Sequence, residues 1–246
     1  MLFPRYIIDI IVDCAMWADK LTRADLVKEY IVTENDYTSN FTSAFRREVD
    51  ARGIPGLEAR IQVLNPSAER KYGADTCVIL ESDLFCKVGI FEAKWPRITF
   101  PGYRWDFLQR STMQSHFHSQ LLLQQNYRPN IAIWEMFYCE CPYYTQPYFM
   151  LDEVSSCVWH DVALSFSMAR GNVKARWSKA ELATLLMSSA ISIGDIIEAM
   201  CLCFEGQRLP KDQYWKLFGD TGLPHSALII SYTDGLERPE LGWRGF

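Results

Sequence analysis

The sequence lacks the short signatures that assign many enzymes at once. It has no Gly-X-Ser-X-Gly elbow, no phosphate-binding P-loop and no dinucleotide-binding glycine fingerprint. Internal repeats, low-complexity tracts and long flexible linkers are also missing. No local pattern therefore points to Ser/His/Asp, P-loop or Rossmann chemistry, or to a repeat architecture.

A long uninterrupted apolar run is missing too. Residues 1–21 are largely apolar, but Asp9, Asp13 and Asp19 interrupt them. The segment is therefore predicted to be neither a signal peptide nor a membrane span. We expect a cytoplasmic protein that does not bind membranes, and whose eight cysteines stay reduced.

Positive charge is scarce overall. The formal net charge is −5, whereas proteins that coat long stretches of nucleic acid are usually basic. Residues 87–110 differ, because basic residues outnumber acidic ones there by three. They are Lys87, Lys94, Arg97, Arg104 and Arg110 against Glu92 and Asp106. Either a phosphate-binding surface or a solvated loop explains this excess.

The chain has enough apolar material for one full core, since 49% of its 246 residues are hydrophobic. We expect an α/β fold in which a helical segment, 1–32, precedes a core, 33–150. A mainly helical extension, 151–246, would pack on that core.

Periodicity and turn residues predict a core of a helix, three strands, a helix and a strand. The last strand follows a helical crossover and should be parallel to a strand already in the sheet. The expected sheet is thus mixed, and its first three strands form a meander. The core elements are expected at 36–52, 61–64, 76–80, 85–93, 107–126 and 131–138. Further helices are expected at 5–18, 157–169, 179–190 and 192–205, and a late strand at 227–232.

The chemically informative residues are Asp75, at the end of a Gly-Ala-Asp segment, and Glu92-Ala93-Lys94. Strand side chains alternate between two faces, so Glu92 and Lys94 should share a face that Ala93 does not. A hairpin over 76–93 would bring Asp75 close to Glu92. We therefore expect two carboxylates and an ammonium group at one edge of the sheet.

That grouping suits phosphodiester hydrolysis. Two close carboxylates repel each other unless a cation lies between them, and Mg²⁺ prefers such oxygen ligands. Asp75 and Glu92 would bind the ion, with the backbone carbonyl of Ala93 as a further ligand. Lys94 would orient the attacking water or neutralise charge on the phosphate. The alternative is an ordinary strand end with an exposed Glu92–Lys94 pair, worth only about 0–1 kcal/mol.

Gly-Ala-Asp at 73–75 with Glu-Ala-Lys at 92–94 resembles the signature of the PD-(D/E)XK, or restriction-endonuclease-like, superfamily. The predicted element order is similar to the common core of that superfamily over roughly residues 33–138. Ala74 departs from the pattern, which has proline there. The resemblance implies that the two acids bind Mg²⁺ or Mn²⁺ and that the lysine assists the nucleophile.

Many members of that superfamily add a glutamate from the first core helix, for which Glu34 is the candidate and Glu69 a weaker one. An acid at a helix N-terminus also simply favours the helix dipole. Gln120 and Gln124 lie four residues apart on one predicted helix face. Gln120 would contact a phosphate or hold Lys94; otherwise it is an exposed surface residue.

Zinc and base stacking are the other candidates. The paired residues are His116-X-His118, Cys139-X-Cys141, Cys157-X-X-His160 and Cys201-X-Cys203. Cys-X-Cys does not match structural zinc spacing, so buried cysteines are expected instead. Tyrosines and a phenylalanine between 138 and 149 would stack on bases or pack in the core.

The functional expectation is a Mg²⁺-dependent DNA endonuclease in host defence or genome maintenance. Cleavage of both strands usually takes two sites, which favours a homodimer, and a partner protein is the other possibility. One alternative is a non-catalytic binding module or inhibitor with the same fold. An RNA-directed nuclease is the second alternative.

Overall fold

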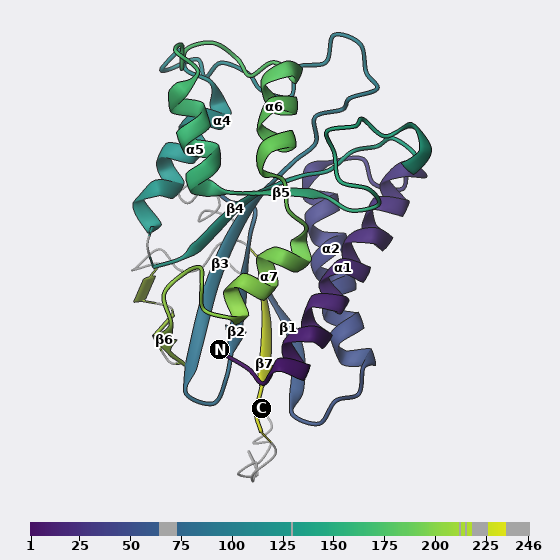
Figure 1. Cartoon of the computed structure of the whole chain (residues 1–246), viewed down its shortest axis with the longest axis vertical. Coiled ribbons are helices and arrows are strands. Elements are labelled where there is room, and N and C mark those ends of the chain that lie inside the picture. The colour runs from purple at the N-terminus through teal and green to yellow at the C-terminus, as the bar shows by residue number, and fades with distance from the viewer. Residues whose placement is uncertain (64–72, 129, 212, 215, 218–225, 235–246) are drawn as a thin grey trace.

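The computed structural model describes residues 1–63, 73–128, 130–211, 213–214, 216–217 and 226–234. In these ranges the chain forms six α-helices and a mixed seven-stranded sheet (Figure 1). The helices are α1 (Arg5–Val27), α2 (Glu34–Ala51), α4 (His116–Gln124), α5 (His160–Ala169), α6 (Lys179–Ser189) and α7 (Ile193–Cys201). The strands are β1 (Leu57–Val63), β2 (Thr76–Glu81), β3 (Phe85–Lys94), β4 (Ala132–Phe137), β5 (Ser156–Trp159), β6 (Leu209–Pro210) and β7 (Ser226–Tyr232).

The strand order across the sheet is β1-β7-β2-β3-β4-β5, and β6 pairs with the start of β3. Strands β3 and β4 are parallel, as are β2 and β7, while the other neighbouring pairs are antiparallel. The predicted α/β class, the mixed sheet and the parallel placement of β4 are therefore confirmed. The predicted three-strand meander is wrong, because β7 lies between β1 and β2.

Composition explains why β7 takes a central place. Its residues Ala227–Ile230 form a continuous buried apolar run, which suits a strand covered on both faces. In β1, by contrast, Glu58, Arg60 and Gln62 alternate with apolar residues, which suits an edge strand with one solvated face. The late strand expected at 227–232 is thus confirmed, and it is part of the centre of the sheet.

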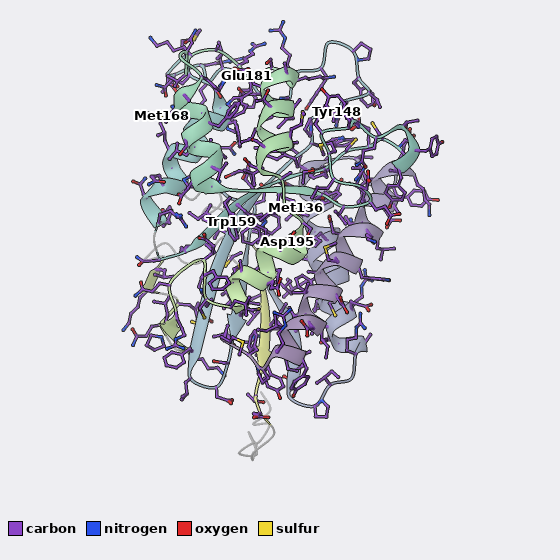
Figure 2. All side chains as sticks on the ribbon, in the orientation of Figure 1. Met136, Tyr148, Trp159, Met168, Glu181 and Asp195 are labelled. Atoms are coloured by element: carbon purple, nitrogen blue, oxygen red, sulfur yellow. The ribbon has the colours of Figure 1, made fainter. Side chains whose placement is uncertain are left out.

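Helices cover both faces of the sheet. Helices α1, α2 and α7 pack on one face around Phe91 and Trp134, and α4, α5 and α6 pack on the other around Phe137. Met136 on β4 is fully buried between these layers, whereas Met168 on α5 projects to solvent (Figure 2). Strands β5 and β7 both come from beyond residue 150, so the C-terminal part contributes strands as well as helices to the core.

The helix predicted over 107–126 begins only at His116, the first residue of α4. Ser115 caps it by accepting the N–H of His118. The buried carboxylate of Asp106 accepts the N–H groups of Phe117 and Trp177 and holds the preceding loop against the helix layer. Residues 107–115 are non-helical because the side chains of Ser115 and Asp106 accept the backbone N–H groups at the start of α4. These N–H groups therefore do not need carbonyl partners from an earlier helical turn.

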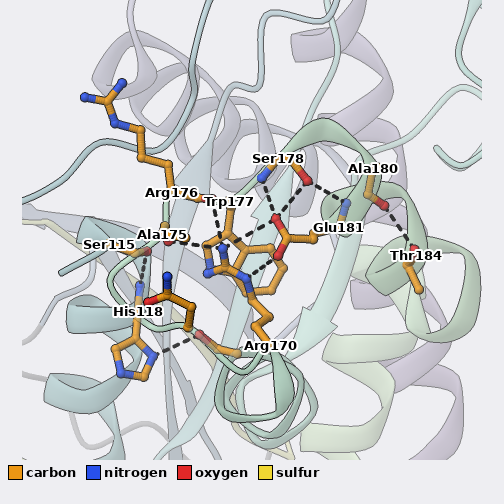
Figure 3. A network of polar contacts seen from close by, with 12 residues as sticks. Ser115, His118, Arg170, Ala175, Arg176, Trp177, Ser178, Ala180, Glu181 and Thr184 are labelled. Carbon is orange, nitrogen blue, oxygen red and sulfur yellow. Dashed lines mark hydrogen bonds and ion pairs between the residues drawn. The ribbon is translucent and has the colours of Figure 1, made fainter.

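A polar network fastens α5 to α6 (Figure 3). Arg170, just after α5, donates to Glu181 at 2.7 Å and to the carbonyls of residues 175–176, and its guanidinium lies 4.5 Å from the ring centroid of Trp177. Ser178 and Glu181 form a capping box at the start of α6. The network keeps the outer helices together above the end of the sheet that carries the candidate site. In the part of the chain that is described, no helix combines the length and the apolar character needed to span a membrane.

Candidate active site

The Gly-Ala-Asp segment forms a tight turn beneath α4. Gly73 has a φ of +63°, a conformation that favours glycine, and a Cβ atom there would lie 3.2 Å from the backbone oxygen of Gln120. The side-chain amide of Gln124 donates to the carbonyl of Gly73 at 2.6 Å. Glycine therefore lets α4 rest directly on this turn, which places the following Asp75 under the helix.

Asp75 and Glu92 lie opposite each other on the antiparallel pair β2–β3. The register pairs Thr76 with Phe91, and the N–H of Asp75 donates to the carbonyl of Phe91 at 2.9 Å. Residues directly opposite in such a pair project from the same face. The Oδ2 of Asp75 also accepts the N–H of Ala93 at 2.7 Å. The sheet thus brings together the two acids predicted to meet, at one end and on one face.

Lys94 and Gln120 both contact Glu92. The Nζ of Lys94 donates to Glu92 Oε1 at 2.5 Å, and the amide of Gln120 on α4 donates to the same oxygen. Glu92 and Lys94 are only 5% and 7% exposed. The interpretation of an exposed surface pair is therefore wrong: this is a buried ion pair enclosed by α4.

Glu34 reaches the same end of the sheet from the first turn of α2. Thr33 and Asp36 form the capping box of that helix, so Glu34 is not needed as a cap. Its Oε1 instead accepts the backbone N–H of Trp95, directly after Lys94, at 2.8 Å. The weaker candidate, Glu69, lies outside the described residues.

The site gathers more negative than positive charge. Burial raises the pKa of Glu92 to about 7 against the opposing effect of Lys94. Burial and the neighbouring Glu92 raise the pKa of Asp75 well above its ordinary range. Burial disfavours the charge on Lys94, but the carboxylates of Glu92, Glu34 and Asp75 outweigh it, so the pKa of Lys94 is raised. The lysine stays cationic, and the acids around it resist full ionisation.

The donor set fits a hard divalent cation rather than a soft one. Asp75 and Glu92 supply carboxylate oxygens. In a strand the N–H and the C=O of one residue point to the same edge. Because the N–H of Ala93 donates to Asp75, the carbonyl of Ala93 also points toward the Asp75 side of β3. In the described ranges, no group of three or more His, Cys, Asp or Glu side chains is arranged to hold a metal. Mg²⁺ retains several waters and needs only one or two carboxylates, so a set of this size suits it.

Most of the paired cysteines and histidines are buried in the core, whereas His116 and Cys203 are partly exposed. Cys139 and Cys141 are both buried, and the N–H of Cys141 donates to Cys139 Sγ at 3.2 Å. His118 bonds to Ser167, and His160 bonds to two glutamines of the α4 region. Tyr138 is likewise buried, whereas Tyr148 stands 82% exposed on the loop after β4 (Figure 2).

The basic segment contributes less to the site than its charge suggests. Lys87 is fully buried at the far end of β3. Arg97 lies nearer, with its guanidinium 4.2 Å from the ring centroid of Trp95. Arg97 and Trp95, with Phe100 and Glu140, line part of a surface pocket of about 550 Å³. Arg97 thus lies three residues after Lys94, at this pocket and against the ring of Trp95.

Sequence reasoning missed Glu135 at the site, and it considered Tyr138 only for base stacking or core packing. Glu135 on β4 pairs in register with Glu92 and is fully buried. Tyr138 has a buried hydroxyl without a hydrogen-bond partner among the described residues, and burial with the charges of Glu34, Asp75 and Glu92 raises its pKa. A signal for Glu135 was present, because it is the one charged residue in the apolar run 131–138.

Comparison of the chain with protein-family models, curated proteins and solved structures gives no match. The functional interpretation therefore depends on the geometry of the site.

Proposed function

We propose that the chain is a metal-dependent nuclease of the PD-(D/E)XK type that hydrolyses phosphodiester bonds, with DNA as the expected substrate. The observation that carries this proposal is the meeting of Asp75, Glu92 and Lys94 on one face of β2–β3. The chain order α2, β1, β2, β3, α4 and β4 supports a restriction-endonuclease-like core, into which β7 is inserted and to which β5 is added.

In this proposal Asp75, Glu92 and the carbonyl of Ala93 hold Mg²⁺ or Mn²⁺, and Glu34 assists from α2. The bound ion would supply Lewis-acid stabilisation of phosphate charge and an activated water at neutral pH. Lys94 stays protonated between three carboxylates, so it can donate a charged hydrogen bond to a phosphate oxygen or orient the attacking water. Gln120 holds the carboxylate of Glu92 in place through its amide.

The exposure of the site indicates how a nucleic acid would approach. Glu92 and Lys94 are buried under α4, while Asp75 and Glu34 are half-buried. The scissile phosphate would therefore come in past Asp75 and Glu34, next to the pocket that contains Arg97. A guanidinium stacked on an aromatic ring is well suited to contact an adjacent phosphate.

A non-catalytic protein with the same fold is the second candidate. The hydrogen bonds from Lys94 and Gln120 already satisfy one oxygen of Glu92, and the net charge of −5 disfavours extended nucleic-acid binding. RNA remains an alternative substrate, since the same side chains would serve hydrolysis of either polymer.

Cleavage assays separate these candidates. The full chain is incubated with supercoiled plasmid, linear duplex, single-stranded DNA and RNA, each with Mg²⁺, Mn²⁺ or EDTA. We expect metal-dependent cleavage of DNA, with Asp75→Asn and Lys94→Ala each reducing the rate by roughly 10²–10³. Glu81→Gln, a buried glutamate at the other end of β2, is the matched control and should cleave like the wild type. Cleavage of no substrate with any metal would favour the non-catalytic protein.

A further inference from the structure

The loop after β3 carries aromatic and basic side chains close together, and it starts one residue after Lys94. The guanidinium of Arg97 lies 4.2 Å from the ring centroid of Trp95 and 5.3 Å from that of Tyr103. The backbone of Arg97 has a φ of +45°, a strained conformation of the kind that clusters at functional sites. The residues of this group, called the aromatic–basic loop below, are Trp95, Arg97, Phe100, Tyr103 and Arg104.

Hydrogen bonds fix the start of the aromatic–basic loop to the candidate site. The backbone N–H of Trp95 donates to Glu34 Oε1 at 2.8 Å, and its ring Nε1–H donates to Glu140 Oε2 at 2.9 Å. The other oxygen of Glu140 accepts the N–H and the hydroxyl of Thr99, each at 2.6 Å. Because consecutive Cα atoms are about 3.8 Å apart, the loop begins within the span of one nucleotide from Lys94.

The first hollow along this loop is the pocket of about 550 Å³, a size typical of small-molecule sites. Trp95, Arg97 and Phe100 line it together with residues that follow α1. Phe100 is 49% exposed, so its ring is accessible to a ligand. The guanidinium of Arg97 already takes the place of a cation against the rings, and it would repel a second one. A neutral flat ring can stack on Phe100 or on the guanidinium, and a nucleobase has that shape and charge.

A second, smaller hollow of about 240 Å³ follows, and Tyr103, whose ring contacts the guanidinium in the first pocket, lines it too. The charged side chains of this second pocket are Arg104, Arg176 and Lys179, and none of its described lining residues is acidic. Lys179 donates to the carbonyl of Ile98 at 2.9 Å, which ties the start of α6 to the loop. Arg104 and Arg176 are exposed, and Arg176 points away from the polar network in Figure 3. Such a group of cations is complementary to a phosphate.

We propose that the aromatic–basic loop and the start of α6 bind an unpaired strand of DNA. One base enters the first pocket and stacks on Phe100 and Arg97, and a neighbouring phosphate lies against Arg104 and Arg176. In a duplex the adjacent bases cover both faces of each base, so only a base outside the stack can contact these rings. This inference rests on the proposed nuclease function and narrows its substrate to DNA with unpaired nucleotides next to the cut.

Equilibrium binding in EDTA tests the surface without cleavage. A fluorescein-labelled single-stranded DNA and the duplex of the same sequence are titrated with the full chain, and fluorescence anisotropy measures the affinity. We expect tighter binding of the single strand. Phe100→Leu keeps an apolar side chain but removes the ring, so it should weaken single-strand binding by about tenfold and leave duplex binding unchanged. Phe204→Leu changes a phenylalanine that is 78% exposed after α7, and it should bind like the wild type.

The salt dependence of the same binding tests the phosphate contacts. For a single strand, each lost contact should reduce the slope of log Kd against log salt concentration by about 0.7. Arg104→Gln and Arg176→Gln should each show this reduction, which a change in folding alone would not produce. Arg47→Gln, at an exposed arginine on α2, is the matched control and should keep the wild-type slope.

Equal affinity for single-stranded and duplex DNA, or no effect of Phe100→Leu, would overturn the proposal. Sedimentation that finds a wild-type dimer and a Phe100→Leu monomer would also overturn it, because a second copy of the chain would then cover the loop. The nuclease proposal is judged separately, by cleavage in Mg²⁺. Cleavage by a chain that binds both forms equally removes only the strand surface, whereas selective binding without cleavage of any substrate supports the surface and removes the nuclease.

Discussion

The raised pKa of Glu92 predicts how the stability of the metal-free chain changes with pH. Burial raises that pKa from the ordinary value of 4.5 to about 7. Between these values the folded chain holds a proton that the unfolded chain has lost. The contribution of Glu92 to stability is therefore fully present below about pH 4.5 and is lost as the pH rises through about 7. At about 1.4 kcal/mol per pH unit, the loss amounts to roughly 3 kcal/mol.

Replacement of Glu92 by glutamine removes this proton and keeps the size of the side chain. The free energy of unfolding of Glu92→Gln minus that of the wild type should therefore increase by roughly 3 kcal/mol from about pH 4.5 to 8. Urea unfolding followed by tryptophan fluorescence, in EDTA and at a series of pH values, measures this difference. Acids far from Glu92 titrate in both proteins, so their contributions largely cancel. Asp75 does not cancel, because the charge of Glu92 raises its pKa; without that charge the pKa of Asp75 is lower, which adds to the expected increase.

A second uncharged variant, Glu92→Met, is the control. It loses the hydrogen bonds from Lys94 and Gln120, which shifts its stability at every pH, yet its difference from the wild type should rise with pH by the same amount. A difference that does not change with pH, or that rises toward acid, would refute the assignment of a raised pKa to this buried carboxylate.

Three further predictions concern the ion, the helix caps and the turn. With Mg²⁺ at about 100 times its dissociation constant, the unfolding free energy of the wild type should rise by about 3 kcal/mol, whereas that of Asp75→Asn should not; thermal melts in Mg²⁺ and EDTA measure this. Glu34→Gln should weaken Mn²⁺ binding without large loss of stability. The control is Asp36→Ala, which breaks the capping box of the same helix. It should cost roughly 1 kcal/mol of stability and leave Mn²⁺ affinity unchanged. If calorimetric titration finds that both variants change Mn²⁺ affinity equally, the assignment of Glu34 to the metal site is contradicted. Gly73→Ala should lose about 1–2 kcal/mol in urea unfolding, because it places a Cβ at a φ of +63° against α4; an unchanged midpoint would contradict this.

The central part of the site could be predicted because it is local. Asp75, Glu92 and Lys94 belong to one hairpin, and the alternation of strand side chains fixes which of them share a face. Glu34 and Gln120 could only be proposed from the resemblance and from helix spacing. Their contacts with Trp95 and Glu92 depend on where α2 and α4 pack, which local periodicity does not specify.

Helix length was predicted less well than helix position. Residues 107–115 contain nothing that forbids a helix, yet Asp106 binds backbone groups of Phe117 and, much further along the chain, of Trp177. Such long-range bonds override a weak local preference. The sequence alone could not show that the helix begins at His116.

The sequence by itself determined the type of most elements, the hairpin and the convergence of two acids with a lysine, because these follow from spacing along neighbouring residues. The helix predicted from residue 157 was wrong at its start, because Ser156–Trp159 form β5 and α5 begins at His160. Only the tertiary structure decided that β7 separates β1 from β2, that α4 buries the Glu92–Lys94 pair, and that Glu135 lies beside Glu92 on the same face of the sheet. The physical reason is that strand order and buried charge are set by how distant apolar surfaces pack together. The spacing of apolar residues along a single strand or helix carries no information about which other element will pack against it.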